Sequence, residues 1–151
     1  MQPWQPLLDF WFGDDSGDAP RAARQAPLWW GKSRETDALL AHRFGELAQA
    51  AAEGELAHWA EVPVGRLALI LPLEHAESRE QQARSVALFE ALAAELADGP
   101  ARETFEGFAD FARRHQVIIQ RFGRFPHRNT ILGRTSTPEE AEFLQQPGSG
   151  F

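Results

Sequence analysis

Residues of the chain's apolar faces recur at helical intervals, and this periodicity constrains the fold more than any other feature. The most regular series has spacings of three and four residues and consists of Phe105, Phe108, Ala112, His115, Ile119 and Phe122. Such spacing places side chains on one face of an α-helix. The apolar run at residues 67–71 is also compatible with a strand, but a single strand without a partner is not stable. The sequence therefore predicts an all-α fold.

About seven helices are expected from this pattern. Their approximate ranges are 3–12, a stretch ending at 31, 36–53, 55–60, 73–97, 102–122 and 137–145, with a small acidic loop at 13–18. Gly54 is expected to end the third helix in the left-handed conformation. Pro72 is expected to separate the run at 67–71 from the long helix that follows. Thr137 to Glu140 has the pattern of a capping box with proline at the first helical position.

Length and composition fit a single domain over residues 1–151. A chain of 151 residues that is 43% hydrophobic and 25% charged can bury its own core. It contains no cysteine, which excludes a disulfide scaffold, a thiol nucleophile and thiolate metal sites. No apolar run approaches the roughly 20 residues that span a bilayer, and the first residues do not resemble a signal peptide. We therefore expect a soluble, cytoplasmic protein without a membrane partner.

Positive charge is concentrated between Arg113 and Arg134. This segment has six arginines, two histidines and no acidic residue, whereas the whole chain has a net charge of −7. Arginine presents a planar fork of donors that suits carboxylates and phosphates, although a high-GC genome also favours arginine. The net charge makes nucleic acid an unexpected partner, and the local arginine patch leaves structured RNA as a third alternative.

The first candidate site follows the helix at 102–122. Pro126 forbids continuation of the helix, and Phe122 and Phe125 are expected to anchor the turning chain to the core. We predict that an anion binds there through charge-assisted hydrogen bonds. The candidate ligand-binding residues are Arg121, Arg124, His127, Arg128, Asn129 and Arg134. Alternatively, these arginines cap helix carbonyls and pair with acidic residues of neighbouring helices.

The second candidate site lies just after Pro72. Glu74 and Glu77 are expected in the first turn of a helix, where carboxylates oppose the helix dipole. His75 lies between them and is a candidate general base, with either carboxylate assisting proton transfer. His115 is either a buried neutral histidine or a lining residue of the same cavity. His75 could also be a metal ligand, but we expect no metal ion because the H-E-x-x-H pattern is absent, and an anion site of this kind needs no cofactor.

A series of short motifs runs along nearly the whole chain. The longest is Arg121 to Asn129, followed by Leu132 to Arg134. The others are Leu8 to Gly13, Trp29 with Trp30, Phe44, Gly54 with Trp59, Pro72 to Ser78, Phe143 with Leu144, and Pro147 to Ser149. Together they closely resemble an uncharacterised bacterial family, domain of unknown function 924 (DUF924). The resemblance implies an all-helical fold similar to tetratricopeptide repeats (TPR-like), and it implies no established chemistry.

The chain departs from the family pattern at Leu71. Family members usually continue from this apolar run into a D-Q-F-x-R-N motif and two further helices, whereas here Pro72 follows directly. We therefore expect that roughly 45–50 residues are missing, and with them part of the family's polar pocket. Burial of apolar surface contributes about 25 cal/mol per Å², so the faces left uncovered should either repack or be covered in a homodimer.

Two functional hypotheses follow. In the first, the chain binds or acts on a small phosphate- or carboxylate-bearing molecule. The arginines would hold the anion, Asn129 would orient it, and His75 with a neighbouring carboxylate would transfer protons. In the second, the chain is a TPR-like interaction module whose arginines grip an acidic protein segment. The sequence does not decide whether the chain is an enzyme.

Overall fold

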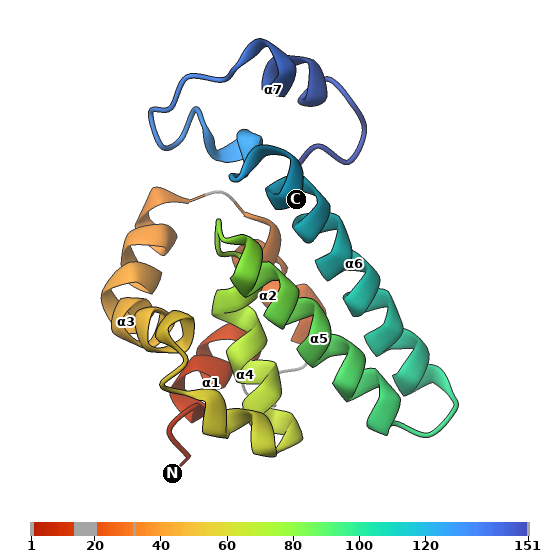
Figure 1. The fold of residues 1–151 in the computed structure, drawn as a ribbon. Helices are drawn as coiled ribbons and strands as arrows, with labels where there is room; N and C mark the ends of the chain where they lie inside the picture. Colours follow the sequence, from red (N-terminus) through yellow and green to blue (C-terminus); the bar gives the residue numbers. More distant parts are fainter. Residues whose placement is uncertain (1, 14–20, 32, 151) are drawn as a thin grey trace. The chain divides into compact units, whose positions relative to one another are not determined.

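The computed structural model describes residues 2–13, 21–31 and 33–150, without the side chains of residues 21, 22 and 30. These residues form seven α-helices and two short 3₁₀ helices, and no strand occurs among them (Figure 1). In chain order they are α1 (Gln5–Phe12), α2 (Arg21–Trp30), α3 (Arg34–Glu53), η1 (Ala57–Glu61), α4 (Pro63–Glu74), α5 (Arg79–Glu95), α6 (Pro100–Phe122), η2 (Pro126–Arg128) and α7 (Pro138–Phe143). The predicted all-α fold is confirmed. The acidic loop predicted at 13–18 lies outside the described residues, except for its first residue.

The chain divides into two compact units, Met1–Leu69 and Ile70–Phe151. Each is described by itself below. The predicted single domain, its TPR-like arrangement and the homodimer stay predictions. In the part of the chain that the structure describes, no helix has the length and apolar character needed to cross a membrane.

In the first unit, aromatic side chains pack where helices meet. The indole Nε1 of Trp29 on α2 donates a hydrogen bond to the carbonyl of Trp11 on α1 at 2.8 Å. Phe10 on α1 packs edge-on against Phe44 on α3, with ring centroids 5.5 Å apart. Aromatic pairs of this geometry stabilise a contact beyond the area they bury. These contacts hold α2 and α3 against α1.

The helix α4 continues through Pro72, so the interruption predicted there is wrong. A proline removes one backbone donor from a helix, but α4 ends only two residues later. The ring Nδ1 of His75 lies 2.9 Å from the carbonyl oxygen of Leu71. This contact provides a side-chain partner for one of the last carbonyls of the helix, which have no partner within the helix itself.

The connection between α4 and α5 is held by the side chain of Gln82. Its amide Nε2 donates to the carbonyl oxygens of Glu74 and Ala76, at 2.6 and 2.9 Å. Ser78 then caps α5 by accepting a hydrogen bond from the backbone of its first turn. Glu74 is therefore the last residue of α4 and Glu77 lies in the connection. The prediction that both lie in the first turn of a helix is wrong.

In the second unit, α5 and α6 run antiparallel and side by side (Figure 1). The predicted inward face of α6 is correct for Ala112, His115 and Ile119, all of which are buried. It is wrong for Phe108, which is 47% exposed, while the neighbouring Ala109 is 2% exposed. Small residues allow two helices to approach closely, and a ring at this point would separate them.

After α6 the chain turns and folds back over the end of the helix. Gly123 has a φ of 72°, in the left-handed region that favours glycine, and ends α6. Phe125 is fully buried in a cluster with Ile118 and Ile119. The helix α7 begins with the predicted capping box, in which Glu140 takes part in both hydrogen bonds. This end of the second unit therefore has a defined backbone path.

Two glycines in and after α3 provide a test of the fold. Gly54 ends α3 with a φ of 82°, whereas Gly45 lies inside the helix, and a Cβ added at either would meet no atom within 4 Å. Gly54→Ala should therefore destabilise the protein by about 1–2 kcal/mol through backbone strain. Gly45→Ala should stabilise it by roughly 0.5–1 kcal/mol, because alanine loses less backbone entropy in a helix. Urea denaturation followed by circular dichroism checks both, and two changes of the same sign would contradict the assigned conformations.

Candidate functional site

The carboxylate of Glu77 ties the α4–α5 connection to the segment after α6. It accepts two hydrogen bonds from Arg134, from Nη1 to Oε2 at 2.6 Å and from Nη2 to Oε1 at 2.8 Å. Its Oε1 also accepts a bond from the backbone N–H of Phe125 at 2.8 Å. The bonds from Arg134 are the main reason why the pKa of Glu77 lies below its usual value. An ionised carboxylate with these partners is poorly placed to transfer a proton.

Asn129 is the next member of this network, and it is 1% exposed. Its Oδ1 accepts a bond from Nε of Arg134 at 3.0 Å, and its Nδ2 donates to Oγ of Ser136 at 3.0 Å. A longer bond of 3.2 Å joins the same Nδ2 to Glu140. The side chain predicted to orient a ligand therefore orients the chain between η2 and α7.

Arg124 and Glu140 form the second bidentate pair. Nε of Arg124 donates to Oε1 at 2.7 Å and Nη2 to Oε2 at 2.8 Å. Glu140 is 2% exposed and also accepts from the backbone N–H of Thr137 at 2.8 Å. These bonds, with that of Arg124 the strongest, lower the pKa of Glu140 to about 2. The pair fixes the start of α7 on the segment after α6.

Arg121 and His127 complete the set predicted in this segment. Arg121 is exposed, pairs with Glu139 at 3.1 Å and lies over the ring of Phe122. The half-buried ring of His127 lies 5.6 Å from that of Phe125. Three of the predicted anion ligands, at 121, 124 and 134, thus bind carboxylates of the chain itself. This is the alternative that the sequence left open for them.

Arg128 is held differently from these three arginines. Its Nη1 donates to the carbonyl oxygen of His75 at 2.9 Å, and its guanidinium carbon lies 4.6 Å from the centre of the Phe125 ring. Stacking on an aromatic face and a bond to a fixed carbonyl orient the guanidinium without removing its charge. The cation is therefore placed beside the end of α4.

Two histidines meet next to this cation. The rings of His75 and His115 have centroids 5.9 Å apart. In each, Nδ1 lies close to the carbonyl oxygen four residues earlier, at 2.9 Å from Leu71 and 3.0 Å from Phe111. A carbonyl only accepts, so Nδ1 donates in both rings, and a neutral imidazole then carries its lone pair on Nε2. Both rings are thereby fixed in one tautomer.

Glu74 is buried beside these rings. Its Oε1 lies 3.8 Å from Nδ1 of His115, which exceeds the length of a hydrogen bond. Burial raises the pKa of Glu74 to about 7 and lowers that of His115 to about 4. Between these two pH values the proton therefore resides on the carboxyl group and the imidazole is neutral. Desolvation by surrounding atoms also lowers the pKa of His75, although part of that residue's surface is exposed to solvent.

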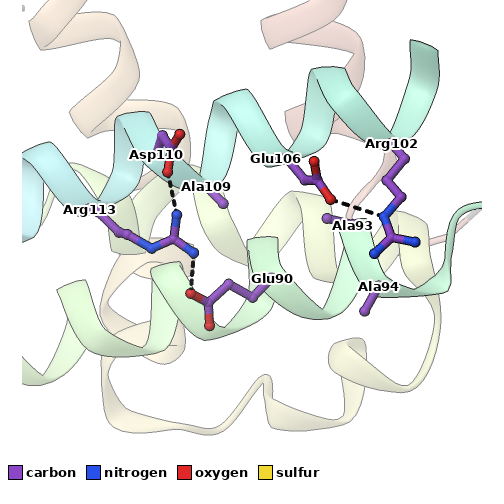
Figure 2. Close-up of a pocket in the computed structure, with 8 residues that line it drawn as sticks. All are labelled: Glu90, Ala93, Ala94, Arg102, Glu106, Ala109, Asp110 and Arg113. Atoms are coloured by element: carbon purple, nitrogen blue, oxygen red, sulfur yellow. Dashed lines mark hydrogen bonds and ion pairs between the residues drawn. The ribbon is translucent and has the colours of Figure 1, made fainter. Parts of the chain in front are cut away.

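A hollow lies in the groove between α5 and α6 (Figure 2). Its volume is about 390 Å³, and its charged residues are paired within the groove: Arg113 with Glu90 and Asp110, and Arg102 with Glu106. This self-neutralised surface does not favour an ionic ligand. Among the described residues, no group of three or more His, Cys, Asp or Glu side chains is placed to hold a metal ion.

The sequence hypothesis grouped Glu74, His75 and His115 with Arg124 and Arg128. Contacts in the structure link Glu74 to His115, His115 to His75 and His75 to Arg128, whereas Arg124 is paired with Glu140. Sequence reasoning missed Glu140 as the partner of Arg124. The capping-box pattern was the available signal, because it places a carboxylate at the start of α7 without saying which cation it meets. It also missed Phe125 as the ring that supports Arg128.

Comparison with known proteins gives a family match and one structural likeness. The model of a family described as "Bacterial protein of unknown function (DUF924)" matches residues 7–72 and 69–148. The two matched segments meet at residues 69–72, where the sequence predicts a missing segment. A solved structure of a protein of unknown function from Agrobacterium tumefaciens, ATU0120, is 25% identical, with 94% of this chain and 96% of that chain covered and a TM-score of 0.43. No curated protein matches the chain.

The network around Glu140 can be tested by its contribution to stability. A pKa lowered to about 2 means that the ionised group stabilises the fold above its ordinary pKa of 4.5, and that this contribution is lost as the pH falls towards 2. Glu140→Gln should therefore lower the thermal midpoint by several degrees at neutral pH and by progressively less in acid. Glu139→Gln on the same helix breaks an exposed pair and should change it little. Equal effects of the two variants, measured by thermal denaturation, would contradict the role of Glu140.

Proposed function

The chain belongs to the DUF924 family of bacterial proteins of unknown function, and we propose from its side-chain contacts that it binds a small phosphate- or carboxylate-bearing molecule. The site is the cluster of Glu74, His75, His115 and Arg128, which we name the α4–α6 cluster. The site is narrower than the sequence suggested, because it leaves out the arginines that bind carboxylates of the chain.

The position of Arg128 carries the proposal. The carbonyl of His75 and the ring of Phe125 orient its guanidinium before any ligand arrives. A guanidinium has five N–H donors in a planar fork, a geometry suited to binding a phosphate or carboxylate through two hydrogen bonds. Because this side chain is already ordered, less conformational entropy of the arginine is lost when a ligand binds.

A hydrogen-bonded network supports this site through Phe125. It consists of Glu77, Arg134, Asn129, Arg124 and Glu140. It fixes the backbone of Phe125 from both sides, because the N–H of that residue donates to Glu77 and its carbonyl accepts from Arg134 at 3.1 Å. We assign these residues to the shape of the site and not to contact with the ligand. The same assignment accounts for an arginine-rich segment in an acidic chain.

The two histidines are the groups that would take up a proton from a bound ligand. Each has Nδ1 directed at a backbone carbonyl, so a neutral ring presents Nε2 as the basic atom. Glu74 holds a proton up to a pH of about 7 and would supply one. A reaction that needs both an acid and a base is compatible with this pair, and binding without reaction is compatible as well.

The second hypothesis, a helical module that grips an acidic protein segment, stays a prediction. It relies on exposed arginines, and Arg121 is the exposed member of the set that the sequence singled out. In that case the buried residues Glu74 and His115 would have no part in binding. Variants at buried and at exposed positions therefore separate the two functions.

Thermal denaturation in the presence of inorganic phosphate, and separately of small carboxylates, tests the binding site. A ligand at about 100 times its Kd should stabilise the wild type by roughly 2.7 kcal/mol, which raises the midpoint by several degrees. Arg128→Gln should abolish this shift while its circular dichroism stays that of the wild type. Arg114→Ala, which removes an exposed arginine of α6 outside the cluster, should retain it. A shift that is lost equally in both variants, or that is absent from the wild type, would contradict the site.

A further inference from the structure

Glu74 has an unusual environment for a carboxyl group. It is 7% exposed, and among the described residues no hydrogen bond to its side chain is formed. Its Oε1 lies 3.8 Å from Nδ1 of His115, and the hydrogen on that nitrogen is directed at the carbonyl of Phe111 at 3.0 Å. Buried ionised groups in proteins are normally paired or hydrogen-bonded. This geometry therefore favours the neutral carboxylic acid.

The groups around Glu74 do not change this conclusion. The amide donors of Gln82 on α5 bind the backbone carbonyls of residues 74 and 76, and Glu77 in the connection is paired with Arg134. The charged and titratable groups of the elements packed here are His75 and Glu77 of the α4–α5 connection, Arg79 of α5, His115 of α6, and His127 and Arg128 of η2. Arg79 is exposed and donates to the carbonyl of Gln120. The cation of the cluster itself is Arg128, which stacks on Phe125.

We infer that Glu74 meets the ligand as a neutral carboxylic acid and donates its O–H to an oxygen of the bound anion. This inference rests on the proposed function of the α4–α6 cluster. A tenth of the side-chain surface of Glu74 is exposed, so an oxygen at the edge of the cluster can reach it. Arg128 would bind the charge of the anion and Glu74 would recognise a terminal oxygen. The ligand class is thus an oxyanion with an unesterified oxygen.

Ionisation of Glu74 would turn this donor into a repelling charge. An ionised carboxylate only accepts hydrogen bonds, and it would face an anion in a place where water screens little. The raised pKa of the group, about 7, puts this change in the neutral range. Anion binding should then be strong at mildly acidic pH and weaken as the pH rises through neutrality.

Calorimetric titration with sulfate tests the inference, because sulfate keeps the same charge over the range of about pH 6 to 9. In the wild type the affinity should fall about tenfold for each pH unit above ~7, as expected when one proton must be bound. Glu74→Gln keeps an uncharged donor of similar shape, so its affinity should stay nearly constant. His42→Gln should keep the wild-type profile, because that exposed residue of α3 belongs to the first unit and not to the cluster.

The outcomes separate the inference from the function on which it rests. If sulfate binds the wild type with a flat pH profile, or if Glu74→Gln retains the fall above neutrality, Glu74 is not the donor and the binding site stands. If sulfate, inorganic phosphate and small carboxylates all fail to bind at any pH, the proposed function fails as well. Circular dichroism of Glu74→Gln shows whether that variant is folded. A titration of the carboxyl ¹³C resonance of Glu74 in the wild type provides the same answer without substitution.

Discussion

The carboxylate of Glu77 is the contact on which the polar structure of the second unit depends. Through three hydrogen bonds it joins Glu77 to Phe125, which lies 48 positions later in the chain, and to Arg134, which lies 57 positions later. Two of these come from a guanidinium, and charge-assisted bidentate bonds are among the strongest that side chains form. Because Phe125 is fixed at its backbone and fully buried, its ring provides a rigid surface for Arg128 on one side and lies 5.6 Å from the ring of His115. A single acidic residue in a connection thus positions the groups of the proposed site.

Charge is distributed between two kinds of position in this unit. Arg121, Arg124 and Arg134 bind carboxylates, so their charges are balanced within the fold. At the α4–α6 cluster the acidic group is Glu74, whose pKa burial raises to about 7, and burial lowers the pKa of the neighbouring His115 to about 4. We propose that an anion at this cluster meets the Arg128 cation, which is oriented by the His75 carbonyl and the Phe125 ring. This difference, and not the number of arginines, distinguishes the proposed site from the rest of the segment.

The sequence predicted the parts of the fold that local chemistry decides. Helical spacing, the left-handed glycine after α3 and the capping box of α7 all involve residues within a few positions of one another. Pro72 was misjudged because the loss of one backbone hydrogen bond can be outweighed by packing, and Leu69, Ile70 and Leu73 around it are buried. Phe108 was misjudged because Ala109 is the buried residue at this level of α6, so Phe108 is half exposed, with its ring 6.1 Å from that of Phe89 on α5. The partners of the arginines were not predictable from the sequence. No spacing pattern indicates which carboxylate from elsewhere in the chain lies within hydrogen-bond distance of a given guanidinium.

The most direct measurement of the central claim is a histidine-selective ¹⁵N NMR titration of the full chain with inorganic phosphate. The five histidines include His42 and His58 in the first unit, which serve as internal references. The ring resonances of His75 and His115 should shift together and saturate at one Kd, while those of His42 and His58 stay in place. If all five shift alike without saturation, or if neither His75 nor His115 responds while another histidine does, phosphate does not bind at the α4–α6 cluster and the account is contradicted.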